Sequence, residues 1–417
     1  MSDLARKDTV RDAQVLIVGG GLVGSCLAGL LVVAGTYGSD QIVLLEPRPP
    51  RRPAPDDDVD LRVSAVSRAS QRILAACSVW DAVAAERNSP YERMCVWDAA
   101  SSRDGPAAMR FDCATAGEPD LGHIVENRRM QWALLERVRA AGVSVIASSV
   151  RALQPEPAGM RVELEDGTCL RAQLVVAADG ADSPTRAMMG IESTAVEHGQ
   201  AVVAHIATSR PHERTAWQRF LATGPIALLP LHDGRCSIVW STTQEHAHEL
   251  MALDDERFCS AVEEATDATL GEVLSCTRRA QFQLRSNHAR HYVADGFCLV
   301  GDAAHAVHPL AGQGVNLGFL DAAALAQVLR EAQEQGEGEG DLRVLRRYER
   351  WRKGENLAML TALDGLNRLF SNDDAWLGVA RRTGLVIANG VGPIKRFFLR
   401  RALGVAGDLP AVARGLR

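Results

Sequence analysis

A glycine-rich turn lies between two apolar runs near the start of the chain. Residues 15–18 lead into Gly19, Gly21 and Gly24, spaced as Gly-x-Gly-x-x-Gly, and a second apolar run ends at Glu46. In a strand–turn–helix unit, the first glycine permits the tight turn, the second lets the backbone approach a pyrophosphate, and the third lets helix and strand pack closely. Glu46 would accept hydrogen bonds from a ribose diol. The pattern predicts a dinucleotide site without separating NAD from FAD.

Two further motifs follow strand-like runs later in the chain. Asp179 and Gly180 come directly after the apolar residues 174–178, and taken alone they would form an ordinary turn. Asp302 comes directly after residues 297–300, where its carboxylate could accept hydrogen bonds from polyol hydroxyls. Both motifs therefore place an acidic residue at the carboxyl end of a strand-like run.

The glycine-rich stretch after Asp302 could bind an electron-rich group. Glycines at a helix start bring backbone N–H groups up to an acceptor, and the helix dipole favours negative charge there. A reduced flavin carries negative charge at its N1/C2 carbonyl edge, which such an arrangement suits. The alternative is a solvated loop that caps a helix. The candidates are, for cofactor binding, Gly312, Gln313, Gly314, Val315 and Asn316, and, for catalysis at the flavin edge, His308 and Pro309.

The elements that must position these motifs indicate an α/β fold. Residues 15–46 form a βαβ pattern, and residues 126–140 have the apolar spacing of a helix. Residues 194–282 contain short strand-like runs and indicate a second domain with a sheet. The polar, glycine-rich residues 333–340 are expected to form a flexible linker that does not pack, followed by a mostly helical tail.

We therefore expect a discontinuous, Rossmann-like dinucleotide-binding domain with an inserted α+β substrate domain and a C-terminal helical region. The expected ranges are 1–80, 124–193 and 283–335 for the first domain, 81–123 and 194–282 for the second, and 341–417 for the helical region.

Composition and charge argue against several classes of protein. The 417 residues carry a formal net charge of −6, which disfavours a general nucleic-acid binder. The nine cysteines are odd in number and never spaced Cys-x-x-Cys, so we expect reduced thiols and no metal site. No apolar run approaches the roughly 20 residues that span a bilayer, and the N-terminus lacks a signal-peptide pattern. We expect a cytoplasmic protein with at most peripheral membrane contact.

In this order, the three motifs resemble those of the single-component flavoprotein aromatic hydroxylases of the para-hydroxybenzoate hydroxylase type. Within that family, the segments that look like the ubiquinone-biosynthesis hydroxylases are residues 60–65, 124–128, 215–220 and 308–318. The segments that look most like the hydroxylase acting at ring carbon 5 of the polyprenylphenol are residues 319–323, 347–350 and 408–410. The resemblance covers essentially the whole chain and implies an FAD-binding domain of the glutathione-reductase type.

This resemblance implies cofactors, partners and further contacts. The cofactor would be FAD, the co-substrate dioxygen, and the electron donor NADPH or a protein. The motif at Asp179 would contact FAD and the nicotinamide donor, and the motif at Asp302 would hold the ribityl chain and the isoalloxazine. Arg62 and Gln131 would contact the FAD phosphates or ribityl chain, although Arg62 on its own could equally form a surface ion pair. The partners would be a polyprenylphenol substrate and other ubiquinone-biosynthesis proteins.

The implied reaction delivers oxygen from a hydroperoxide at flavin C4a to an electron-rich phenol ring. Because an exposed hydroperoxide decays to hydrogen peroxide, the site must exclude water, and the apolar residues 227–231 suit such a pocket. His308 and His205 are candidate bases, although a lone histidine is more often structural. His198 stands where relatives often have tyrosine, and it is either a polar pocket residue or an ordinary strand residue.

Other readings stay open. Residues 395–403 mix basic and apolar side chains, as interfacial helices do, but a helix packed on its own domain would have the same composition. A flavin halogenase would carry a Trp-x-Trp-x-Ile-Pro stretch and a pocket lysine, and neither is evident. A flavin-dependent polyprenyl reductase is a further alternative. A catalytically silent flavin-binding assembly subunit is another, although it would have no need of the motif at residues 302–316.

Overall fold

The first sheet carries the glycine turn. The structure, a computed structural model, describes residues 11–85, 87–307, 314–370 and 403–416. Five strands of this sheet run parallel in the order β19-β11-β1-β2-β8, β18 pairs antiparallel with β19, and β9 and β10 form a hairpin-like extension of β11. The strands are β1 (Arg11–Val18), β2 (Ile42–Leu45), β8 (Ser144–Ile146), β9 (Val150–Glu156), β10 (Gly159–Leu164), β11 (Cys169–Ala177), β18 (Val293–Ala294) and β19 (Phe297–Leu299).

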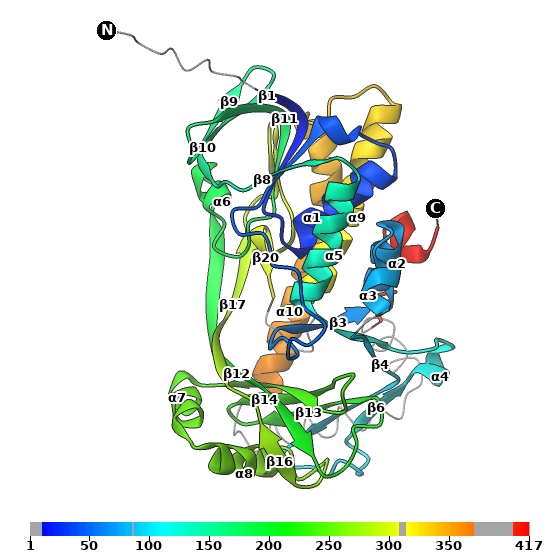
Figure 1. The fold of residues 1–417 in the computed structure, drawn as a ribbon, viewed down its shortest axis with the longest axis vertical. Helices are drawn as coiled ribbons and strands as arrows, with labels where there is room; N and C mark the ends of the chain where they lie inside the picture. The colour runs from blue at the N-terminus through cyan, green and yellow to red at the C-terminus, as the bar shows by residue number, and fades with distance from the viewer. Residues whose placement is uncertain (1–10, 86, 308–313, 371–402, 417) are drawn as a thin grey trace.

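Three helices pack together beside this sheet (Figure 1): α1 (Leu22–Val33), α5 (Asn127–Ala140) and α9 (Gly314–Glu334). Helix α1 is buried without interruption from Gly24 to Leu31, and its small residues allow close approach of α9 and α5. A short 3₁₀ turn, η1 (Ser39–Gln41), leads into β2. The parallel order and the buried α1 give the α/β class, which confirms the expected fold class.

The second sheet has the order β20-β17-β12-β15-β14-β13-β5-β6, with β16 beside β12. Helices α7 (Gln244–Ala252) and α8 (Asp255–Ala265) cover one face, where they pack on Val202, Ala204 and Ile206. The alternate residues Ala201 and Val203 point to the opposite face. The strands are β5 (Arg93–Asp98), β6 (Met109–Asp112), β12 (Ser193–Thr208), β13 (Thr215–Leu221), β14 (Gly224–Pro230), β15 (Cys236–Thr242), β16 (Val273–Cys276), β17 (Ala280–Ala289) and β20 (His305–Ala306).

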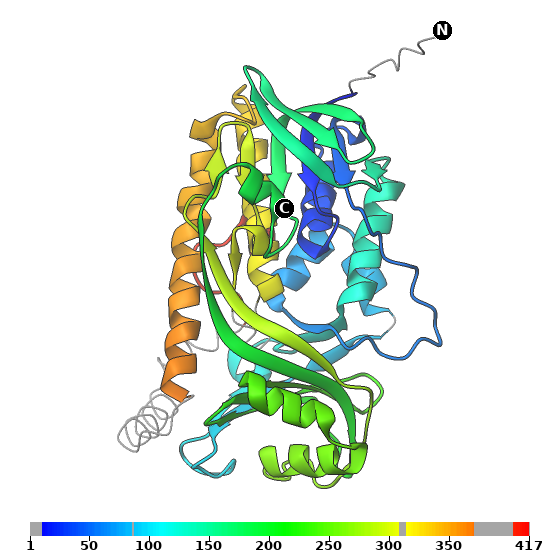
Figure 2. The same cartoon turned by 90° about the vertical axis from the view of Figure 1, so that its left-hand side faces the viewer.

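Strands β12 and β17 are long and run from this sheet up to the first domain (Figure 2). The domain boundary expected between residues 282 and 283 therefore falls inside β17. Between the two large sheets lies a small antiparallel sheet in the order β3-β7-β4, and short helices lie between its strands along the chain. These elements are β3 (Val63–Ser67), β4 (Ser89–Tyr91), β7 (Gly122–Glu126), α2 (Arg68–Ala76), α3 (Trp80–Ala84) and α4 (Cys113–Ala116).

The stretch after α9 packs, so the expectation of an unpacked linker at residues 333–340 is wrong. The carbonyl of Gly340 accepts a hydrogen bond from the Gly296 N–H at 2.9 Å, and a Cβ on Gly340 would lie 2.4 Å from the Gln173 carbonyl oxygen. Glu337 forms ion pairs with Arg343 and Arg347. The glycine permits a close backbone approach, and the arginines neutralise the acid, so this polar stretch can pack.

Helix α10 (Leu342–Phe370) runs alongside the first domain, where it packs on α9 and β18 (Figure 2). The chain ends with a 3₁₀ turn, η4 (Ala411–Arg414), against α2 and α9. Across the described ranges, no helix combines the length and apolar character that crossing a bilayer requires.

Candidate functional site

The glycine turn at the end of β1 is shaped by close backbone contacts. Gly19 has φ +104° and donates its N–H to the Leu45 carbonyl at 2.9 Å, which joins the turn to β2. A Cβ on Gly24 would lie 1.9 Å from the Gly19 carbonyl oxygen, so only glycine fits there. Among the described residues, no heavy atom lies within 4 Å of a Cβ built on Gly21, which precedes α1. The turn therefore leaves the α1 N-terminus open to a phosphate group.

Two side chains hold this turn in place. Gln131 on α5 donates from Nε2 to the Gly20 carbonyl at 3.0 Å, and Ser25 donates its hydroxyl to the same oxygen at 3.0 Å. Glu46 is half-buried at the end of β2, and its Oε1 accepts the Arg48 N–H at 2.9 Å. A direct contact of Gln131 with FAD stays a prediction, because the structure assigns its amide N–H to the glycine turn.

The Asp179 carboxylate caps a short helix. It accepts hydrogen bonds from the Ser183 hydroxyl at 2.5 Å and from the Thr185 hydroxyl at 2.7 Å, at the start of α6 (Pro184–Met188). Gly180 has φ +91°, which favours glycine. The Asp179 side chain therefore orders the turn that leads into α6.

Arg186, on α6, connects the second motif to the third. Its side chain is buried and donates to the Ala303 carbonyl at 2.7 Å and to the Ala181 carbonyl at 2.9 Å. Burial lowers the pKa of this guanidinium, and the charges of Asp179 and Asp182 oppose that shift. Sequence reasoning gave Arg186 no role, because its partner, the Ala303 carbonyl, lies more than a hundred residues away along the chain.

The third motif presents an exposed acid. The 3₁₀ turn η2 (Gly301–Ala303) follows β19, and the Asp302 side chain between its buried neighbours is exposed. Desolvation by the surrounding protein raises the pKa of the Asp302 carboxyl, and the positive charges of His305 and Arg62 offset part of the rise. Arg62 is itself exposed, with its guanidinium carbon 5.9 Å from the centre of the Phe282 ring. The structure therefore brings Arg62 and Asp302 within electrostatic range of each other.

The start of α9 supplies the predicted helix N-terminus. The helix begins at Gly314, so the backbone N–H groups of Gly314, Val315 and Asn316 lie in its first turn. The Asn316 side chain faces inward, where Oδ1 accepts the Ser67 N–H at 2.9 Å and Nδ2 donates to the Ala65 carbonyl at 2.8 Å. The predicted residues His308, Pro309, Gly312 and Gln313 lie outside the described residues.

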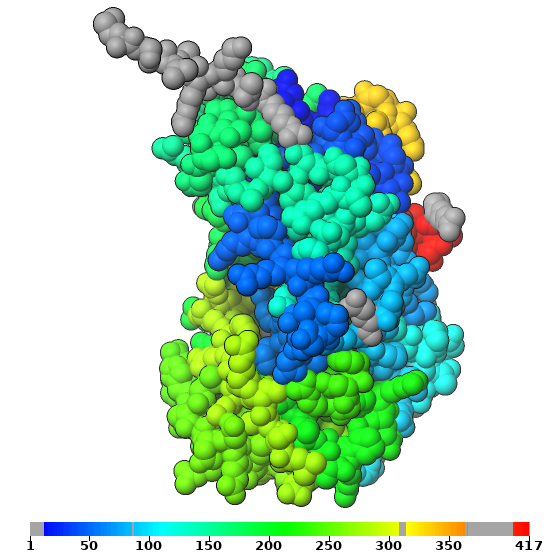
Figure 3. Space-filling view, in the orientation of Figure 1, coloured from blue at the N-terminus to red at the C-terminus, as the bar shows by residue number. Residues whose placement is uncertain are grey.

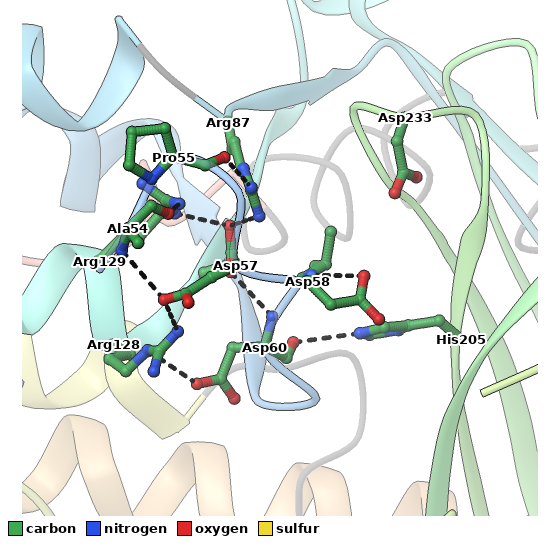
Figure 4. Close-up of polar contacts among 12 residues, drawn as sticks. Ala54, Pro55, Asp57, Asp58, Asp60, Arg87, Arg128, Arg129, His205 and Asp233 are labelled. Atoms are coloured by element: carbon green, nitrogen blue, oxygen red, sulfur yellow. Dashed lines mark hydrogen bonds and ion pairs between the residues drawn. The ribbon is translucent and has the colours of Figure 1, made fainter. Parts of the chain in front are cut away.

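Arginine contacts fix a long loop between β2 and β3 at the junction of the two large domains. Figure 3 shows this segment, in blue, on the surface between the two halves of the molecule. In Figure 4, Arg128 pairs with Asp57 at 2.8 Å, and Arg129 donates to the Ala54 carbonyl at 2.9 Å. Toward the second domain, the Asp58 carboxylate pairs with Arg235 at 2.5 Å. The loop is therefore tied to both domains.

His205 on β12 contacts this loop from the second domain. Its Nε2 lies 3.2 Å from the Asp60 carbonyl, so Nε2 carries the proton and Nδ1 is left as an acceptor (Figure 4). Burial lowers the pKa of His205, although the hydrogen bond to Asp60 opposes the shift, and the ring is neutral at pH 7. Nδ1 is buried and has no hydrogen-bond partner among the described residues. His198 lies nearer the start of β12, and its Nε2 lies 2.7 Å from the Ser286 hydroxyl oxygen on β17.

Comparisons with known proteins agree with this geometry. A family model described as FAD binding domain matches residues 12–361. Ubiquinone hydroxylase UbiL of Rhodospirillum rubrum is 37% identical over 410 residues, which cover 97% of this chain and 93% of the relative. The 3-demethoxyubiquinol 3-hydroxylase of Escherichia coli is 36% identical over 401 residues, which cover 95% of this chain and 100% of the relative. The chain belongs to the FAD-dependent hydroxylases of ubiquinone biosynthesis.

The hydroxylase also shares its fold with a solved structure. The p-nitrophenol 4-monooxygenase PnpA from Pseudomonas putida DLL-E4 superposes with a TM-score of 0.73 and 17% identity, over 94% of this chain and 99% of that one. At this identity the likeness concerns the fold alone.

The residues of the hydroxylase fit FAD. The open space at Gly21 and the α1 N-terminus suit a pyrophosphate, and Glu46 at the end of β2 suits the ribose. The exposed Asp302 carboxylate is an acceptor for ribityl hydroxyls, and the first turn of α9 offers N–H groups to the flavin edge. The chain thus provides groups that suit the pyrophosphate, the ribose, the ribityl chain and the flavin edge.

Proposed function

We propose that this hydroxylase adds a hydroxyl group to the ring of a polyprenylphenol in ubiquinone biosynthesis, at ring carbon 5. The observation that carries the proposal is similarity to hydroxylases of that pathway over nearly the whole chain, together with the convergence of the FAD motifs. The E. coli relative is named as a 3-hydroxylase at almost the same identity as UbiL. Overall identity therefore does not choose the ring carbon, and carbon 5 rests on residues 319–323, 347–350 and 408–410.

FAD would supply the reductive activation of dioxygen, with electrons from NADPH or a protein donor. The residues of the chain have two tasks in this reaction. The glycine turn, Asp302 and the start of α9 hold and orient the cofactor. The surfaces between the domains must exclude water and place an aromatic ring beside it.

An apolar surface between the domains supports a hydrophobic substrate. On the face of the second sheet that lies away from α7 and α8, Ala201, Val203 and Val239 pack with Leu61 of the first domain. On β14 and just after it, Leu229 and Leu231 are buried against Val59 and Ala65. The apolar character of these side chains suits the ring and first isoprene units of a polyprenylphenol, whereas a charged substrate would find no partners among them.

We also propose that the protein is cytoplasmic and that residues 395–403 contact the membrane peripherally. The membrane is where a polyprenyl substrate would reside. This segment lies largely outside the described residues, and its alternation of basic and apolar side chains supports the proposal. Charge reversal by Arg400→Glu with Arg401→Glu should reduce flotation with anionic liposomes. Unchanged flotation would remove the proposal, as would an equal loss with Arg414→Glu, a single charge reversal on η4. Assembly with other proteins of the pathway is a further proposal, which co-purification would test.

The direct test is turnover by the purified protein. FAD, NADPH or a reduced protein donor, and a short-chain prenylphenol are supplied under ¹⁸O₂, and the product is analysed by mass spectrometry and NMR. We expect one ¹⁸O atom in the product and a new hydroxyl at carbon 5. Substrate reduction without oxygen incorporation would contradict the proposal and favour a reductase. Hydroxylation at another carbon would correct only the ring position.

A further inference from the structure

A buried carboxylate on α9 binds four donors. Asp321 is fully buried, and its Oδ2 accepts the Gly301 N–H at 3.1 Å and contacts Nε2 of His305. Its Oδ1 accepts from Arg352 Nε at 2.8 Å and from Asn356 Nδ2 at 3.1 Å. Arg352 also donates to Asn356 Oδ1 at 2.9 Å, which closes the network. Since a carboxylate offers about four lone-pair sites, Asp321 is saturated.

The protonation state of Asp321 follows from these partners. Burial alone would raise the pKa of its carboxyl, but the charges of His305 and Arg352 and their hydrogen bonds outweigh burial and hold the pKa far below its usual range. Asp321 is therefore ionised at neutral pH. Its charge and its orientation are fixed features of the structure.

The residue that Asp321 holds begins the turn at the FAD site. Gly301 has φ +59°, and it is followed by the exposed Asp302 and then by Ala303. On the far side of the turn, Arg186 binds the Ala303 carbonyl at 2.7 Å. The turn is thus fixed at both ends by buried charged groups, and the Asp302 side chain projects from between them.

Helix α10 makes two more hydrogen bonds close to the Asp302 turn. The Tyr348 hydroxyl donates to the Leu299 carbonyl at 2.9 Å, at the end of the strand that leads into the turn. Glu349 accepts the Tyr292 N–H at 2.8 Å, and the Tyr292 ring stacks on His305 with centroids 5.9 Å apart. The C-terminal helix therefore contacts β19 and, through Asp321, the turn that follows it.

Stability alone does not account for such a network. A buried ion pair is often no more stabilising than apolar residues of the same volume, because both charges lose their hydration. Buried polar networks that are fully satisfied do define one geometry, since any shift leaves a charge without partners. The Asp321 carboxylate has a donor at each of its four sites, so any shift of the Gly301 turn would leave a buried charge short of a partner; Nδ1 of His305 is the one buried atom of this network without a hydrogen bond among the described residues.

We propose that Asp321 is a positioning residue for FAD. Through the Gly301 N–H it fixes the turn that presents Asp302 to the ribityl chain, and Arg352 and Asn356 of α10 set the orientation of its carboxylate. Asp321 itself does not touch the cofactor. The known FAD dependence of the family is sufficient for this inference, so it does not rest on the identity of the substrate.

A double-mutant cycle on FAD affinity tests the proposal. The dissociation constant is measured by titrating FAD fluorescence with the apoprotein of the wild type, Asp321→Asn, Asp302→Ala and the double variant. We expect Asp321→Asn to weaken FAD binding by about tenfold or more. In the Asp302→Ala background the same change should have an effect of less than about threefold, because its consequence passes through Asp302. An equal loss in both backgrounds, or no loss in the wild-type background, would overturn the proposal.

Two further variants separate positioning from loss of folding. Asp321→Asn with Arg352→Gln removes the whole Asp321–Arg352 ion pair, so Arg352 is not left as an unpaired charge, and it gives the same predictions if Asp321→Asn alone does not fold. Glu349→Gln removes a charged acceptor from the same helix without touching the turn. It should lower the melting temperature and leave FAD affinity within about threefold of the wild type. A tenfold loss of affinity in Glu349→Gln would mean that any weakening of α10 has this effect, which would also overturn the proposal.

Discussion

At the scale of single residues, Gly24 makes the most stringent demand on the sequence. A Cβ there would lie 1.9 Å from the Gly19 carbonyl oxygen, and backbone cannot rotate away as a side chain can. We predict that Gly24→Ala destabilises the fold by about 3 kcal/mol and abolishes FAD binding, because the glycine turn must open. Thermal unfolding and FAD titration measure the two effects.

The control for this prediction lies on the same helix. A Cβ on Gly29 would meet Cys77 at an ordinary 3.5 Å. Gly29→Ala should therefore retain FAD binding and leave stability unchanged or raise it by up to about 1 kcal/mol, through better helix propensity. If the two alanine variants behaved alike, the argument from close approach at Gly24 would be wrong.

The lowered pKa of the buried His205 ring predicts that the free energy of unfolding depends on pH. Its folded-state pKa is lowered, chiefly by burial, so the unfolded chain binds more protons as pH falls through about 6.5. The contribution of His205 to the free energy of unfolding is therefore complete above that pH and is lost below it. The pKa values of His212 and His288 are also lowered by burial, so these residues contribute in the same direction. We predict a smaller decline in His205→Gln between about pH 7.5 and 5.5, measured by denaturant unfolding.

The comparison for His205→Gln is His248→Gln, a change at an exposed position on α7. That variant should keep the wild-type pH dependence. If His205→Gln declined as steeply as the wild type, burial of a neutral ring at this position would not be the cause.

Residue types and spacing predict the glycine turn and the acid at Asp302 better than they predict the residues that support them. The glycines of the first turn and Asp302 stand in local motifs, so their backbone roles follow from a few consecutive residues. Asp321 and Arg352 were not predicted to meet, because they lie on different helices, and Gly301, which donates to Asp321, lies before both. No local pattern encodes contacts between segments so far apart.

At the scale of elements, Arg186 joins α6 to the turn at Asp302. Arg186→Met would leave the Ala303 carbonyl without its buried donor, so we predict a loss of about 2 kcal/mol in stability and weaker FAD binding. Arg186→Lys should recover part of the affinity, because it retains a charged donor that can reach one carbonyl. Denaturant unfolding and FAD titration of the two variants check this.

Arg171 provides the comparison for Arg186. It lies on β11, is half exposed, and pairs with Glu156 at 3.1 Å on the surface. Arg171→Ala should cost less than about 1 kcal/mol and leave FAD binding unchanged. An equal loss in both arginine variants would argue against a specific link between the two motifs.

Composition misled us about one element. Residues 333–340 are rich in glycine and glutamate, which favours a flexible linker. In the structure α9 continues to Glu334, and Glu337 finds two arginines that α10 brings back to it. The partners of a polar segment come from tertiary structure, so its flexibility could not be read from its own residues.

At the scale of the whole molecule, an FAD-binding domain and a sheet-bearing domain are joined by two long strands and by the loop between β2 and β3, which contacts Arg235 and His205. The α/β class and the FAD motifs were predictable, because both depend on strand–turn–helix patterns within the chain. The continuity of β17 across the expected domain boundary was not predictable, because the sequence pattern of a strand does not change where the strand passes from one domain to the next.

The central claim is that this FAD-dependent hydroxylase modifies a polyprenylphenol on the route to ubiquinone. Mass spectrometry of quinone intermediates in cells that lack its gene tests the claim most directly. We predict accumulation of a polyprenylphenol that lacks one ring hydroxyl, relieved by the intact gene and not by the Asp302→Ala variant. A normal quinone profile in those cells would contradict the claim and would direct the search to other aromatic substrates.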